Sequence, residues 1–71
     1  MYSKGDIVNY TLDDSDNPGI AKIELIKPKF KMLGYTCWNV KVIEVIKRST
    51  FAGNPKVGKT ETISERWFRK D

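Results

Sequence analysis

The sequence contains no histidine and only one cysteine, Cys37. A single thiol cannot form an internal disulfide, and without imidazole it cannot assemble a Cys/His zinc site. The missing histidine also removes the usual general base for a serine or cysteine nucleophile. We therefore predict a protein that is not an enzyme, binds no metal or cofactor, and resides in a reducing, cytoplasmic compartment.

Long hydrophobic runs are also missing. No apolar run approaches the ~20 residues that cross a bilayer, and residues 1–6 contain no apolar signal region. We expect a chain that is not exported and does not bind membranes. With 71 residues the chain has room for a single domain, 1–71, and its 39% of hydrophobic residues is too high for a disordered segment.

Alternation of apolar and polar residues predicts β-strands along most of the chain. Residues 5–12 form the first expected strand, and the acidic, Asn and Pro-Gly residues of 13–19 form a turn. Residues 20–27 form the second expected strand. Pro28 is expected to end its pairing, because proline has no N–H to donate, and a basic connection is expected from there to Gly34.

The third expected strand, residues 35–48, changes phase partway along. Residues up to Val42 alternate in one phase, whereas Ile43 and Val45 follow the other. A bulge or sharp bend near Val42 and Ile43 explains this shift, because one extra residue redirects every later side chain. Cys37 lies in an apolar stretch, where we expect a buried, unreactive thiol. The apolar faces expected to meet in the core comprise Val8, Tyr10, Leu12, Ala21, Ile23, Leu25, Trp38, Val40 and Val42.

The last third of the chain predicts a long connection and two short strands. Residues 49–58 are rich in turn formers, and residues 59–63 have the Thr-rich composition of a strand. Residues 64–70 are expected to form one helical turn and a short closing strand. Trp67 or Phe68 is expected to close one end of the core, because so small a core needs large side chains.

Three segments carry a resemblance to a known fold family: KGDIVNY at 4–10, PGIAKI at 18–23 and ISERW at 63–67. In order and spacing they resemble SH3-like small barrels of the KOW and Tudor kind. The resemblance implies an all-β fold, a small five-stranded antiparallel SH3-like barrel with a short 3-10 turn before the last strand. It implies no particular activity, because this architecture hosts many unrelated functions.

Residues 53–60 match the phosphate-binding pattern G-x-x-x-x-G-K-[ST], which resembles the first motif of small GTPases. Such a loop must follow a buried parallel strand directly, whereas polar residues 47–50 intervene here, and too few residues follow Thr60 to build a parallel sheet. We predict a solvated hairpin loop. Lys56 and Lys59 remain candidates for contact with a phosphate backbone.

The acidic segment 13–17 suggests a calcium loop, because Ca²⁺ prefers alternating oxygen ligands. Counted from Asp14, however, the fifth position is Pro18 and the twelfth is Leu25, so the bidentate glutamate is missing. We predict a solvated turn. A surface that binds nucleic acid is expected to lie away from it.

Basic residues exceed acidic ones by four, 13 to 9, and several are interleaved with aromatic residues. This pattern is typical of surfaces that pair phosphate contacts with base stacking. We predict a small binding module for DNA or RNA, with Phe30 or Tyr35 stacking on a base. The predicted site comprises Lys27, Lys29, Phe30, Lys31, Tyr35, Lys41, Arg48, Lys56 and Lys59.

The same exposed aromatic residues allow a second interpretation. They could instead hold an acidic protein surface, which would make the chain a protein-interaction or inhibitor module of the kind found among phage and mobile-element accessory proteins. The edges of an incompletely closed barrel also allow a homodimer. Salt-dependent binding to oligonucleotides would distinguish the two interpretations.

Overall fold

A computed structural model of the protein describes residues 2–51 and 53–69. It contains β1 (Ile7–Thr11), β2 (Ile20–Met32), β3 (Tyr35–Lys47), β4 (Thr60–Ser64), the 3-10 turn η1 (Glu65–Trp67) and β5 (Phe68–Arg69). All neighbouring strands are antiparallel, in the order β4-β3-β2-β1-β5. The predicted five-stranded all-β fold and the 3-10 turn before the last strand are confirmed.

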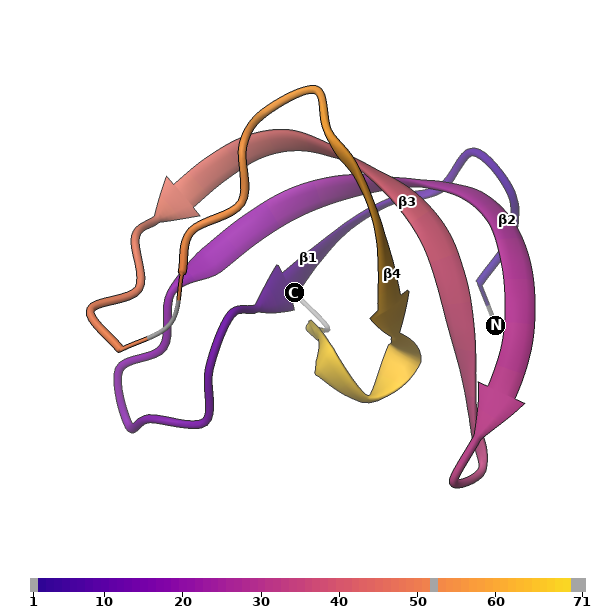
Figure 1. Cartoon of the computed structure of the whole chain (residues 1–71), viewed down its shortest axis with the longest axis horizontal. Coiled ribbons are helices and arrows are strands. Elements are labelled where there is room, and N and C mark those ends of the chain that lie inside the picture. The colour runs from indigo at the N-terminus through magenta and orange to yellow at the C-terminus, as the bar shows by residue number, and fades with distance from the viewer. Residues whose placement is uncertain (1, 52, 70–71) are drawn as a thin grey trace.

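The sheet is strongly curved but not closed (Figure 1). The two outer strands, β4 and β5, are joined through η1 rather than paired with each other. The sheet is therefore compatible with a small barrel-like fold, although the predicted barrel slightly overstates how far the sheet closes. In the described part of the chain, no helix is long and apolar enough to cross a membrane.

The core lies inside the curve of the sheet and is made of the apolar faces that the sequence predicts. Seven side chains that are at most 5% exposed form it: Tyr10, Ala21, Ile23, Leu25, Trp38, Val40 and Val42. Trp67 and Phe68 are half-buried against this cluster, and the Phe68 ring meets Tyr2 edge to face at 4.9 Å. Both of these aromatic residues therefore help to close the core.

Bulges bend the two long strands, which Figure 1 shows as curved arrows. Lys22 pairs with Glu44 and Ile23 with Val42, so Ile43 is an extra residue on β3. The bulge predicted near Val42 and Ile43 is confirmed. Three further register shifts occur along this pair of strands. Each extra residue increases the local bend and twist, and together they let β2 and β3 curve around one core.

Pro28 does not end β2, and the predicted basic connection up to Gly34 is wrong. The strand continues through Pro28, which pairs with Trp38, as far as Met32. Pairing with β1 ends earlier, at Glu24. Beyond Leu25, no described residue pairs with the edge of β2 that faces away from β3, which we call its outer side. An edge strand tolerates proline because the missing N–H interrupts no ladder on the open side.

The acidic segment folds into a turn around one carboxylate. Asp13 accepts hydrogen bonds from the backbone N–H of Ser15 at 2.9 Å and from the Ser49 hydroxyl at 2.6 Å, and also from Gly19 N–H. Ser49 is buried, and its N–H donates to Asn54 at 2.7 Å. In the part of the chain that the structure describes, no three acidic, Cys or His side chains form a metal site.

Asp13 should make stability depend on pH. Hydrogen bonds donated by Ser15 and Ser49 hold the pKa of Asp13 well below its usual range. This stabilisation is complete above about pH 4 and is lost as the pH falls toward the folded-state pKa. In thermal melts from about pH 7 to about pH 3, the wild type should therefore lose more stability than Asp13→Asn. Equal losses would contradict this role, and the exposed Asp14→Asn serves as the control.

Candidate functional site

Three of the predicted lysines lie on one face of the sheet, on the side opposite the core. Lys27 is paired with Asn39, and Asn39 with Thr62, so the three residues form one row across β2, β3 and β4. Lys41 follows two residues after Asn39 and points to the same side. The Lys29 ammonium donates to the Thr62 hydroxyl at 3.4 Å and so reaches this face as well.

The register assigns both predicted stacking residues to the side of Asn39, and at the turn end of this side Tyr35 and the buried Cys37 also line a hollow with Trp67. Phe30 is paired with Cys37, and Met32 is paired with Tyr35. Cys37 and Tyr35 are two and four residues before Asn39 on β3, so they lie on the same side of the strand as Asn39. Phe30 is 48% and Tyr35 is 44% exposed, as the stacking prediction requires. We refer below to Lys27, Lys29, Phe30, Tyr35 and Lys41 as the basic-aromatic face.

Lys31 and Arg48 lie apart from this face. Lys31 is paired with Thr36. Thr36 is two residues from Trp38 and so lies on the same side of β3 as this core residue, which places Lys31 on the side opposite the basic-aromatic face. Arg48 follows the end of β3, where it lines a hollow together with Asp14 and Asp16. Strict alternation along β2 would keep Lys27, Lys29 and Lys31 on one side, but the register shift between Pro28 and Phe30 moves Lys31 to the other.

Lys56 and Lys59 lie in the connection between β3 and β4. The Lys59 N–H donates to the Lys56 carbonyl at 3.2 Å, and the Lys59 carbonyl accepts from Val42 N–H at 2.9 Å. Residues 53–60 thus lead into an antiparallel strand, as predicted, and not into a helix whose N–H groups could bind a phosphate. Both lysines are exposed.

The turn between β2 and β3 exposes an apolar tip. Leu33 and Gly34 have positive φ angles of 53° and 84°, the geometry of a two-residue hairpin turn. This conformation is common for Asn and Gly but unfavourable for Leu. Leu33 is nevertheless 86% exposed, and Met32 beside it is also exposed. The sequence contained the signal, an X-Gly pair between two apolar residues, but the role assigned to Pro28 concealed it.

A hollow of about 190 Å³ lies beside the tip. Its lining is mainly apolar, and of the described residues it includes one charged group, Arg66, whose guanidinium lies over the Trp67 ring at 5.5 Å. In residues 2–51 and 53–69, no carboxylate forms an ion pair with Arg66. The lining residues are Met32, Leu33, Tyr35, Cys37, Ser64, Arg66 and Trp67, which we call the tip hollow.

Hydrogen bonds fix the 3-10 turn that supplies this arginine. The indole Nε1–H of buried Trp38 donates to the Glu65 carboxylate at 2.6 Å. Ser64 caps the turn, because its hydroxyl accepts from the Arg66 N–H at 3.2 Å. Glu65 therefore positions Arg66, and sequence reasoning missed it because the contact joins residues 27 positions apart.

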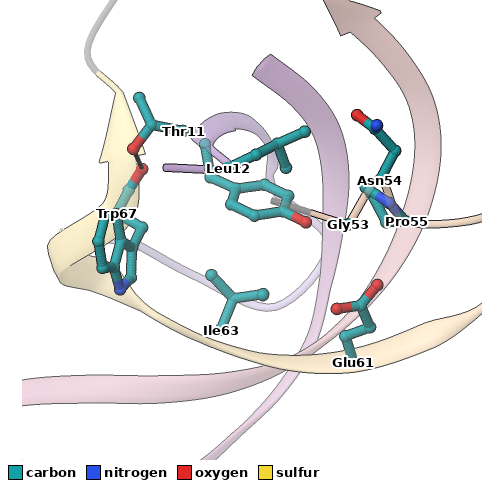
Figure 2. Close-up of a pocket in the computed structure, with 9 residues that line it drawn as sticks. Thr11, Leu12, Gly53, Asn54, Pro55, Glu61, Ile63 and Trp67 are labelled. Carbon is teal, nitrogen blue, oxygen red and sulfur yellow. Dashed lines mark hydrogen bonds between the residues drawn. The ribbon is translucent and has the colours of Figure 1, made fainter. Parts of the chain in front are cut away.

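A second hollow, of about 320 Å³, lies at the open seam between β1 and β4 (Figure 2). Figure 2 shows Glu61 and Ile63 on one side and the ring of Trp67 at its end. Tyr10 also lines it, and burial, followed by the nearby Glu61 carboxylate, raises the pKa of this phenol to about 12. None of the predicted binding residues lines this hollow.

Comparison with known proteins finds no matching family model and no significant match among curated proteins or solved structures.

Proposed function

We propose that the chain is a non-enzymatic module that binds DNA or RNA through the basic-aromatic face. The observation that supports this proposal is the register of β2 and β3, which collects three lysines and two exposed aromatic rings on one side. Lysines attract the phosphate backbone, while Phe30 and Tyr35 provide surfaces on which unpaired bases stack. The acidic turn at Asp14 and Asp16 lies at the other end of β3, away from this face.

Salt dependence tests the phosphate contacts. Replacing Lys27 and Lys29 together by Gln should reduce the slope of log affinity against log salt by about one to two units. Replacing Lys47 and Arg48 by Gln removes the same charge at the other end of β3 and should leave the slope unchanged. Fluorescence anisotropy with labelled single- and double-stranded oligonucleotides measures both. No binding at low salt, or equal slopes for the two variants, would refute the proposal.

A second candidate function is protein interaction, in which the chain occupies the surface of a partner as an accessory or inhibitor protein. The observation that favours it is the exposed apolar tip, where Leu33 is held in an unfavourable backbone conformation. Strained residues that persist on a surface often have a binding role.

The strand order and the 3-10 turn also support the proposal that the fold is SH3-like, of the KOW and Tudor kind.

A further inference from the structure

The tip hollow shares Tyr35 with the basic-aromatic face, but its other lining residues have the composition of a protein-binding site. It is lined by the exposed Met32, Tyr35 and Arg66 and by the half-buried Trp67, which are residue types enriched in protein interfaces. Leu33 and Met32 offer no ring on which a base could stack, so of the lining residues only Tyr35 and Trp67 provide one. Its volume of about 190 Å³ is below the range of sites for small-molecule ligands, so it suits one inserted side chain.

The charge of the tip defines the partner further. Among residues 2–51 and 53–69, Arg66 is the only charged one that lines the hollow, and its stacking on Trp67 holds the guanidinium in place. A planar guanidinium held this way binds a carboxylate through two parallel hydrogen bonds. Every charge on residues 26–36 is positive, from Lys27, Lys29 and Lys31. A second copy of this chain would therefore meet like charge at the tip.

We propose that the tip hollow binds a partner protein segment in which a large apolar side chain stands next to a carboxylate. The apolar side chain fills the hollow against Leu33 and Trp67, and the carboxylate pairs with Arg66. The carboxylate could come from Asp or Glu or from the end of a chain. This inference rests on the second candidate function and names the chemistry of its partner.

Selection from a library of short random peptides tests the proposal. Immobilised wild-type protein should enrich peptides that carry a large apolar residue beside Asp, Glu or a free C-terminus. Synthetic versions of the enriched peptides, with free and with amidated C-termini, then identify which carboxylate Arg66 binds. Enrichment of basic peptides, or of none, would overturn the proposal, and the absence of any enrichment would count against the protein-interaction function as well.

Two variants tie the binding to the tip. Leu33→Asn and Arg66→Gln should each lower the affinity for the selected peptides by about tenfold or more. Leu33→Asn should fold normally, because Asn adopts positive φ more readily than Leu, and circular dichroism checks this. Phe51→Asn, at another exposed apolar residue, and Arg48→Gln should bind like the wild type. Peptides that bind Leu33→Asn as tightly as the wild type would overturn the proposal while leaving protein interaction standing.

The other macromolecules are tested in the same way. Leu33→Asn should bind oligonucleotides as the wild type does, because Leu33 lies outside the basic-aromatic face. Anionic phospholipid vesicles should retain Leu33→Asn as well as they retain the wild type, because any attraction to the lysines does not involve Leu33. If Leu33→Asn weakened oligonucleotide binding, or if the vesicles bound the wild type but not this variant, the occupant of the tip would be nucleic acid or lipid and the proposal would be wrong.

Discussion

Replacing Ile23 by alanine should destabilise the protein by ~2–5 kcal/mol. Ile23 is fully buried on the central strand β2, where it is paired with Val8 on one side and Val42 on the other. Truncation removes apolar contacts on both sides and leaves a cavity that the neighbouring strands can fill only in part. Small domains have little stability to spare, so much of the Ile23→Ala population should be unfolded at 37 °C.

Urea unfolding followed by circular dichroism measures this loss. Ile7→Ala is the matched control, because it makes the same chemical change at a β1 residue that is 53% exposed. We expect the control to change the free energy of unfolding by less than ~1 kcal/mol. A similar loss for both variants would show that the burial of Ile23 does not determine stability.

Gly19→Ala should cost ~1–3 kcal/mol or more, through a steric clash rather than a cavity. A Cβ atom on Gly19 would lie 2.6 Å from the Ser49 backbone nitrogen and 2.9 Å from Leu12 Cδ1. These distances are well inside normal contact distances of about 3.5 Å or more. The clash would push apart the two segments that Asp13 joins through its hydrogen bonds to Gly19 and Ser49.

Gly53→Ala is the control for this substitution. A Cβ at Gly53 would meet no atom within 4 Å, and its backbone is outside the positive-φ region. The two variants can be compared by thermal melting, and only Gly19→Ala should lower the midpoint substantially. A normal midpoint for Gly19→Ala would mean that the Ser49 backbone can move away at little cost.

The strands and the core could be predicted because local alternation determines them. Apolar residues recur at every second position of β1, at Val8 and Tyr10, and of β2, at Ile23. These side chains are buried or half-buried, as expected. The phase change near Ile43 predicted a bulge because a fixed period of two allows no other simple explanation. The helical turn predicted after residue 63 is likewise present as η1, where the Ser64 hydroxyl accepts from the Arg66 N–H.

The errors arose where the outcome depends on residues far away in the sequence. Whether Pro28 ends a strand depends on whether another strand pairs on its outer side, and only the extent of β1 decides that. The role of Asp13 depends on Ser49, which is 36 residues away. Lys31 was grouped with Lys27 and Lys29, and the register shift between Pro28 and Phe30, which depends on the pairing with β3, moves it to the other side.

The open outer side of β2 has a consequence for the free protein. An unpaired strand edge can add a strand from another molecule, and natural proteins prevent this with lysines and prolines along the edge. Residues 27–31 of β2 alternate Lys, Pro, Lys, Phe and Lys. Lys27 and Lys29, which we propose for phosphate contact, therefore also disfavour sheet-to-sheet aggregation, and a partner that neutralises their charge would remove that protection.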